Sequence, residues 1–446
     1  MQLSIPSHAS FKPRILSWAL ALVCVTASAM ELSDPASVRE SVMPPIIAAD
    51  PARPAQAPNE IAIRSVLDED GADAGLILAA RALDASRLAY GVKDARTLTP
   101  LINQAHLRQR GGDTAGALKD YRAAIDLAEA SGGPRDAQLF AAWYGTGYAY
   151  LAANQPQAAA PALETALQLH RINHGLYSAA QLEILHALAQ SARGIGKIED
   201  ADELQRRRIE VAERVHGTGT VPVTQTYVAV GRWYREIGRA ESAVALHGLA
   251  VQTLERFPKE QSGLIQALLE LAVSGTGRRR DMDEMPLLPA LRPTNAVARA
   301  EKLLDENKTL TPVQHADLRL RLGDAQQLIG RQDAALRSYI KVRELFAAQG
   351  KTPPFDSPAF IRLQLPVIEP VTGPGGFLLA EFDVDTKGRA SNIRILEAQP
   401  SSLPAGPRNT LSNALKASQL RPKLDKNQPV AAKGMRYRLA VRGDSA

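Results

Sequence analysis

A short pattern of residues recurs every 42 positions along the chain, and this repeat constrains the fold more than any other feature. Each copy has a glycine or asparagine five residues before an alanine, and these turn residues are Gly112, Asn154, Gly196 and Gly238, with a later copy at Gly330. Agreement at a fixed spacing predicts a repeat architecture, in which copies of one supersecondary unit stack on each other.

Two further positions describe the repeating unit. A small residue lies seven positions before each turn residue, and a large apolar residue lies four positions earlier again. The small residues are Ala105, Gly147, Ala189, Gly231 and Gly323, and the large ones are Leu101, Trp143, Leu185 and Tyr227, with Arg319 in the last copy. Small residues let two helices approach closely, and glycine or asparagine accepts the left-handed backbone of a tight corner. We therefore expect stacked helical hairpins, each made of a helix A and a helix B.

The stretch WYGTGYAYLAANQPQAAAPALETALQL at 143–169, and a second at 320–342, resemble tetratricopeptide repeats. The 42-residue step is similar to the longer kinesin-light-chain variety, and the resemblance covers about 95–256 and again 312–348. It implies a mostly α-helical protein with an α-solenoid over residues 59–350, in which the helix A side lines a concave groove for a partner.

Some helix positions depart from this family pattern. Gln205, Arg208 and His247 occupy helix B sites that the family fills with apolar or small residues, so we expect those faces to be partly exposed. Arg319 raises the same question at the start of the last helix A. The period breaks within 257–311, where two helical segments could form one degenerate hairpin interrupted by an insertion.

The N-terminus has the layout of a secretory signal. Lys12 and Arg14 precede an apolar run of twelve residues, and small residues follow at Ala27 and Ala29. This predicts a signal peptide over residues 1–29 and a periplasmic location. The run is short for a membrane span, which needs about 20 apolar residues. The alternative is an uncleaved anchor that holds the protein in the inner membrane, facing the periplasm.

Cleavage of that signal would remove Cys24, the only cysteine, and would exclude disulfides and thiol chemistry. Six prolines within residues 30–58 predict a disordered tether. A second proline cluster predicts a linker over residues 351–374, which separates the solenoid from a C-terminal module at 375–446.

The C-terminal module shows strand periodicity. Apolar residues alternate from Leu378 to Val384, a turn follows at Gly388, and a short amphipathic helix separates this hairpin from the alternating segment MRYRLAVR. The predicted order is β-β-α-β. It resembles the C-terminal domain of the TonB energy-transducer family, and the matching residues are Val384, Asp385, Gly388, the helix over 408–420, Pro422, Pro429 and Val430. Asn427 departs from the glycine that the family tends to have there, and the family's aromatic pair before Pro422 is missing.

The TonB resemblance implies that the sheet edge accepts an extended peptide by β-augmentation. Arg436 and Arg438 would face outward and suit an acidic peptide, and residues 366–446 carry twelve Lys/Arg against seven Asp/Glu. Two alternatives remain open: these arginines only keep the sheet soluble, or the module only caps the solenoid.

Candidate partner-binding residues on the helix A side follow from the tetratricopeptide resemblance. They are Tyr144, Tyr148, His186, Gln190, Arg193, Arg232 and Arg235. Arg193 and Arg235 are 42 residues apart, so we expect them in adjacent hairpins on one wall that could hold a carboxylate. The alternative is ordinary polar decoration of exposed helices.

The sequence shows no catalytic, cofactor or metal motif that we assign. His170 and His174 are four residues apart but lack a third ligand at a convincing spacing, and basic residues do not interleave with aromatic ones as nucleic-acid binding requires. The sequence thus predicts a non-catalytic periplasmic adaptor that binds envelope proteins or peptide segments. The rivals are a TonB-type transducer, which would be the only version held in a membrane, and an enzyme with a dispersed site.

Overall fold

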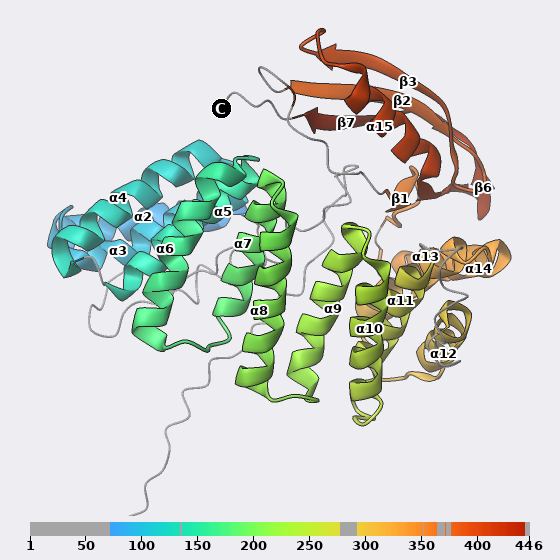
Figure 1. Cartoon of the computed structure of the whole chain (residues 1–446), viewed down its shortest axis with the longest axis horizontal. Coiled ribbons are helices and arrows are strands. Elements are labelled where there is room, and N and C mark those ends of the chain that lie inside the picture. Colours follow the sequence, from blue (N-terminus) through green and yellow to red (C-terminus); the bar gives the residue numbers. More distant parts are fainter. Residues whose placement is uncertain are drawn as a thin grey trace, which may run out of the picture. The chain divides into compact units, whose positions relative to one another are not determined.

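The computed structural model describes residues 72–133, 136–276, 292–350, 352–363, 371 and 376–441, so the predicted signal peptide and tether lie outside the described residues. An array of paired α-helices precedes a small α/β module (Figure 1). The helices A are α3 (Leu98–Arg110), α5 (Ala137–Ala152), α7 (Gln181–Ile195), α9 (Val221–Glu236), α11 (Gln261–Gly275) and α13 (Pro312–Leu328). The helices B are α2 (Ala72–Tyr90), α4 (Thr114–Gly132), α6 (Pro156–His174), α8 (Ile198–His216), α10 (Ala240–Leu254), α12 (Pro293–Glu306) and α14 (Gln332–Ala347). A single 3-10 turn, η2 (Ala95–Thr97), leads into α3.

Each predicted turn residue lies between a helix A and its helix B. The backbone is left-handed at all five, with φ of 86° at Gly112, 57° at Asn154, 95° at Gly196, 79° at Gly238 and 81° at Gly330. Glycine adopts this conformation without the steric cost of a Cβ atom, and asparagine tolerates it better than most residues. The hairpin prediction is therefore confirmed at every corner.

The small residues of helix A bring helix B against the backbone. A Cβ atom on Gly147 would lie 2.5 Å from Cγ of Leu163, and one on Gly231 would lie 2.4 Å from Nε2 of His247. Such distances are too short for real contacts, so a larger residue would force the two helices apart. The alanines that follow the corners are all fully buried, and they are Ala117, Ala159, Ala201, Ala243 and Ala335.

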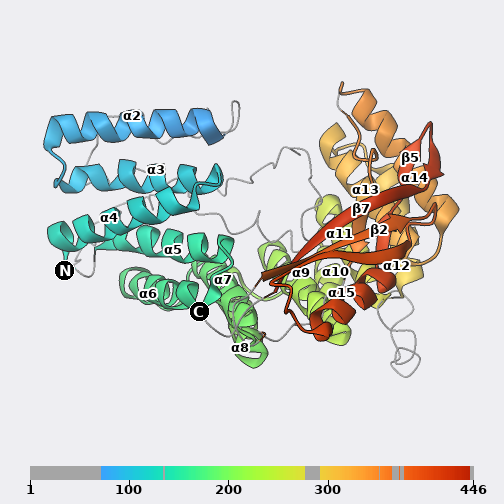
Figure 2. The ribbon, with the colours of Figure 1, turned by 90° about the horizontal axis from the view of Figure 1, so that it is seen from above.

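A second set of left-handed corners repeats at the same interval, and our reading of the sequence missed it. Gly91, Gly133, Gly175 and Gly217 each follow the end of a helix B and have positive φ. The buried residues Ala79, Ala82, Leu83 and Ser86 of α2 lie 42 positions before buried residues of α4. The helix predicted as an N-terminal cap is thus in the register of a helix B, and Figure 2 shows it as the first of several neighbouring rows.

The hairpin array continues through the region where the period breaks. α11 packs against α12, and both contribute to the core cluster that also contains residues of α9, α10 and α13. Leu268 and Leu271 of α11 and Val297 and Leu304 of α12 are fully buried. The two segments predicted as a degenerate hairpin are therefore helices packed in the core, and most of the predicted insertion lies outside the described residues.

The expected exposure of three helix B sites is wrong. Gln205, Arg208 and His247 are 0%, 5% and 0% exposed. Burial is possible because each has a polar partner inside the array: Nη2 of Arg208, for example, lies 3.2 Å from Oε1 of Glu183. Arg319 is buried in the same way and forms an ion pair with Asp305.

The C-terminal module has the predicted β-β-α-β order with additional short strands. Its long elements are β2 (Gly376–Val384), β3 (Ala390–Gln399), α15 (Ala405–Ala417) and β7 (Ala432–Val441). The short strands are β1 (Ala359–Arg362), β4 (Gln419–Arg421), β5 (Lys423–Asp425) and β6 (Gln428–Val430). β2 lies between β3 and β7 in an antiparallel sheet, while β1 pairs with β4 and β5 with β6.

One face of this sheet forms a core with α15. Leu378, Phe382 and Val384 of β2 are buried together with Leu411 and Leu415 of α15. The alternate residues of β2 point to the opposite face, as the period of two predicts.

The described part of the predicted linker packs against its neighbours. Phe355 is 1% exposed and clusters with Tyr339 of α14 and with Leu424 of β5. Arg421 of β4 makes a bidentate contact to Asp324 of α13, with nitrogen–oxygen distances of 3.0 and 2.7 Å. The last hairpin and the C-terminal module are therefore joined by buried apolar and charged contacts as well as by the chain.

Candidate functional site: the helix A wall

Successive helices A place polar side chains within reach of one another. We call this surface the helix A wall; it consists of Gln190 and Arg193 of α7, Arg232, Arg235 and Glu236 of α9, Glu270 of α11, and Asp317 and Arg321 of α13. Gln190 and Arg232, like Arg193 and Arg235, are separated by one 42-residue repeat, so they occupy equivalent positions in adjacent hairpins as predicted.

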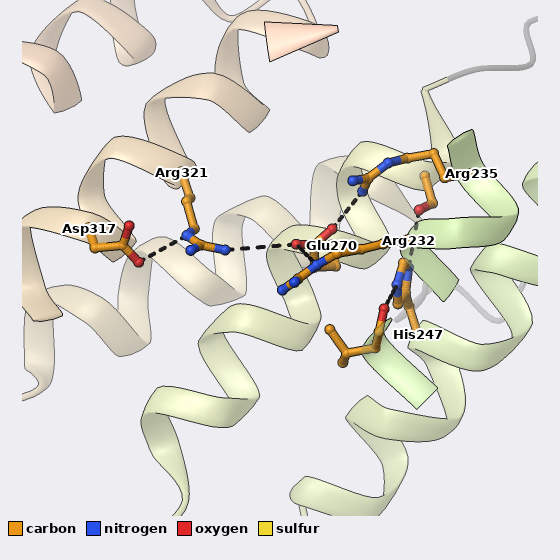
Figure 3. A network of polar contacts seen from close by, with 8 residues as sticks. Arg232, Arg235, His247, Glu270, Asp317 and Arg321 are labelled. Atoms are coloured by element: carbon orange, nitrogen blue, oxygen red, sulfur yellow. Dashed lines mark hydrogen bonds and ion pairs between the residues drawn. The ribbon is translucent and has the colours of Figure 1, made fainter. Parts of the chain in front are cut away.

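Three guanidinium groups of the wall converge on one carboxylate (Figure 3). Nε of Arg232 lies 2.7 Å from Oε1 of Glu270, and Nη1 of Arg235 lies 2.6 Å from Oε2. Nη1 of Arg321 is 3.9 Å from Oε1 of Glu270, and its Nε lies 2.9 Å from Oδ2 of Asp317. Side chains of α9, α11 and α13 are thereby linked in one charged cluster.

This cluster carries more positive than negative charge. Burial alone would raise the pKa of Glu270, but Arg232 and Arg235 outweigh it and hold the pKa of that carboxyl well below its usual range. Glu270 is therefore ionised, and with Asp317 it provides two negative charges against three arginines. The arginine side chains of Arg232, Arg235 and Arg321 remain 33%, 25% and 42% exposed, so solvent or a ligand can reach them.

A buried histidine supports the cluster from α10. Nε2 of His247 donates to the carbonyl oxygen of Val228 at 3.2 Å, and its Nδ1 lies 3.1 Å from Oγ of Ser274. Burial lowers the pKa of His247 to about 4. The neutral ring therefore connects α9, α10 and α11 next to Glu270 without adding charge.

A second ion pair extends the wall toward the N-terminus. Nη1 of Arg193 lies 2.9 Å from Oε2 of Glu236, and both side chains are about one-third exposed. The predicted pair Arg193 and Arg235 thus lies on one wall, but each guanidinium already has a carboxylate partner within the chain. A role for these arginines in holding a partner's carboxylate stays a prediction.

Three other predicted contact residues are buried. Tyr144 and Tyr148 are each 5% exposed, and His186 is 8% exposed. The ring of Tyr144 stacks on Phe140 with centroids 5.9 Å apart. Burial lowers the pKa of His186 well below its usual value, and its Nε2 accepts from Gln190 at 2.9 Å. These side chains support the wall from within, and Gln190 alone of this group is partly exposed.

The two predicted arginines of the C-terminal sheet are exposed and have local partners. Nε of Arg436 lies 3.6 Å from Oε2 of Glu381, and the guanidinium of Arg438 lies 3.8 Å above the ring centroid of Phe377, in a cation–π contact. β7 forms one edge of the described three-stranded sheet. Pairing of that edge with a partner strand stays a prediction.

The two histidines weighed as metal ligands contact a hydroxyl and each other. Nε2 of His170 lies 2.5 Å from Oγ of Ser178, and its ring centroid is 4.6 Å from that of His174. Across the described ranges, no group of three or more His, Cys, Asp or Glu side chains could hold a metal ion. None of the helices in these ranges combines the length and the apolar character that crossing a bilayer requires.

Glu270, Glu236 and Arg321 were not among the predicted site residues. Glu270 lies in α11, after the 42-residue period has broken, so it has no counterpart in an earlier repeat. A search for acidic residues on helices A that flank the predicted arginines would have found Glu236, which directly follows Arg235. Arg321 would have required the position of α13 relative to α11.

The paired helices, their two sets of corners and the charged wall define a helical-repeat protein, a class that presents extended binding surfaces. Residues 96–172 match the tetratricopeptide repeat family, so this part of the chain carries tetratricopeptide repeats. That match does not include the C-terminal module, and its resemblance to the TonB family stays a prediction.

Among solved structures, the kinesin light chain TPR-like repeats of Podosopora anserina are 15% identical to this chain, with a TM-score of 0.40, over 44% of this chain and 94% of that one. BtubC (BKLC) from P. vanneervenii is 18% identical, with a TM-score of 0.39, over 63% of this chain and 93% of that one. No curated protein sequence matches the chain.

Proposed function

We propose that this protein is a non-catalytic scaffold of the bacterial periplasm, whose helix A wall binds an acidic segment of another envelope protein. The observation that carries the proposal is the cluster of three partly exposed arginines around the single carboxylate of Glu270. The basic, apolar and small-residue pattern of residues 1–29 supports export.

An acidic partner would meet Arg321 first. Its side chain is the most exposed of the three, and its Nη1 lies 3.9 Å from Glu270, beyond hydrogen-bond distance. A guanidinium presents several N–H donors in a planar fork that matches a carboxylate. The partner's carboxylate would therefore add to the existing cluster, and Glu270 would keep its bonds to Arg232 and Arg235.

The C-terminal module would supply a second contact. β7 spans ten residues at the edge of the sheet and has two exposed arginines. An extended acidic peptide could pair with the backbone of this edge by β-augmentation.

The test of the wall compares purified protein variants on an array of acidic peptides and their Asn/Gln counterparts. We expect the acidic peptides to bind more tightly, and Arg321→Gln to weaken their binding about tenfold, as loss of a charged hydrogen bond does. Arg122→Gln is the matched control, because Arg122 is 72% exposed on α4 and pairs only locally with Asp126. Equal binding of the two peptide sets, or equal effects of the two variants, would refute the proposal.

The order β-β-α-β in the C-terminal module favours a second candidate, an inner-membrane TonB-type transducer. Mass spectrometry of the mature protein separates the two candidates. A chain that starts near Met30 supports the released scaffold, whereas a chain that retains residues 11–29 supports an anchored transducer.

A further inference from the structure

Exposed apolar side chains gather along one edge of the helical array. One edge carries the A-to-B corners, and the other carries the loops that join each helix B to the next helix A. Most exposed large apolar residues of the described chain lie at these B-to-A loops, and we call them the apolar edge: Leu88, Val92, Ile172, Leu176, Tyr177, Phe257 and Val313. Among the described residues, none lies at an A-to-B corner. The loops after α6, α8 and α10 share one side of the array in Figure 1.

The loop between α6 and α7 contributes most to this edge. Ile172 and Leu176 are 59% and 61% exposed, and Tyr177 is 38% exposed. The loop follows the left-handed corner at Gly175, which ends α6. Three large apolar side chains within six residues thus project from a short connection, where polar residues would be the ordinary choice.

Cations surround these apolar side chains. The guanidinium carbons of Arg207 and Arg214 lie 5.2 and 5.4 Å from the ring centroid of Tyr177. The hydroxyl of Tyr177 donates to Glu210 at 3.3 Å, and Arg207 pairs with the same carboxylate at 2.6 Å. Glu210 can balance only one of the two arginines, so this part of the edge has an excess of positive charge.

We propose that the apolar edge docks on an anionic lipid surface, with Leu176 and Tyr177 inserted at the level of the headgroups. Amphipathic aromatic rings and aliphatic side chains enter this interface, and nearby arginines attract anionic lipid phosphates. Side chains that project from loop tips suit a deformable layer, whereas a bound peptide requires a groove. The docking surface lies at the loops, apart from the helix A wall, and does not depend on the proposed function.

The test measures co-sedimentation of the full chain with vesicles of phosphatidylethanolamine and phosphatidylglycerol, and with phosphatidylcholine vesicles. We expect binding to the anionic vesicles that weakens with added salt, since exposed charges are screened. Leu176→Ser should weaken it about tenfold, from the apolar area lost, and Arg214→Gln about fivefold. Both side chains are on the surface, so folding should be unchanged, as circular dichroism can check.

Leu249→Ser is the matched control, because Leu249 is 41% exposed in the middle of α10, away from the loops. Failure of the wild-type chain to bind anionic vesicles overturns the proposal, and so does equal binding by Leu176→Ser and Leu249→Ser. If Leu176→Ser instead abolishes peptide capture and leaves vesicle binding intact, the edge is a protein contact. Arg321→Gln should bind vesicles normally, so this proposal and that for the helix A wall can fail separately.

Discussion

Replacement of Glu270 by glutamine should make the protein less stable and its acidic ligands tighter. The carboxylate of Glu270 neutralises guanidinium groups from α9 and lies within 3.9 Å of Arg321 of α13. Glutamine has nearly the same shape but no charge. Three arginines would then repel one another across α11, and their free donors would favour a partner's carboxylate. Opposite changes in stability and affinity would distinguish a binding surface from a purely structural cluster.

The size of the stability loss follows from burial. The Glu270 side chain is 11% exposed, and those of Arg232 and Arg235 are 33% and 25% exposed. Each ion pair contributes about 4 kcal/mol at an effective dielectric constant of about 20. Desolvation of the carboxylate offsets several kcal/mol, and the arginines regain water when it is lost. We therefore expect Glu270→Gln to lower the local free energy of unfolding by about 3 kcal/mol.

Hydrogen exchange followed by mass spectrometry is the appropriate assay. A stack of repeats unfolds locally, so amide exchange in α9 and α11 should accelerate about a hundredfold, with little change in α3 and α4. Glu306→Gln is the control, because the pair of Glu306 with Lys302 is exposed and 4.0 Å long, and its loss should change stability by less than about 1 kcal/mol. Unchanged exchange in α9 and α11 would show that the cluster does not stabilise the array.

Three other changes test further parts of the structure. Acid should destabilise the array, because burial lowers the pKa of His106 to about 3 and of His247 to about 4 from an ordinary value of 6.5. The unfolded chain then binds more protons, so this stability is complete above about pH 6.5 and is lost as pH falls toward 4, which thermal melts at graded pH can follow; a flat profile would contradict it. Gly147→Val should lower the unfolding free energy by about 2 kcal/mol or more in denaturant titrations, since its Cβ would overlap helix B, and an unchanged midpoint would mean that the helices can separate freely. Arg421→Gln should loosen the C-terminal module and speed limited proteolysis between residues 351 and 374, whereas the exposed-site variant Arg122→Gln should leave cleavage unchanged.

The corners of the array could be predicted because their information is local. A left-handed backbone at Gly112 or Gly196 is encoded by one residue type, and the 42-residue spacing reveals it in several copies. The close contact of Gly147 with helix B was predictable for the same reason, since a small residue recurs at a fixed distance from the corner. The strands and the helix of the C-terminal module followed from simple periodicity.

The charged cluster could not be predicted because it depends on placement between helices. Glu270 meets Arg232 and Arg235 across 38 and 35 residues, and no repeat relates them. The burial of Arg208 and His247 was missed because residue type alone predicts exposure, whereas Glu183, Val228 and Ser274 provide partners inside the array.

The corners that follow the helices B affect how such a chain can change in length. Gly133 and Gly175 end consecutive helices B with φ of 77° and 83°, so removal of the 42 residues after Gly133 would rejoin segments that point the same way. A whole cassette could be lost or duplicated while the interfaces on either side keep their geometry. An insertion of any other size within a helix would shift the buried alanines out of register. Evolution could thus adjust the reach of the array in steps of one cassette.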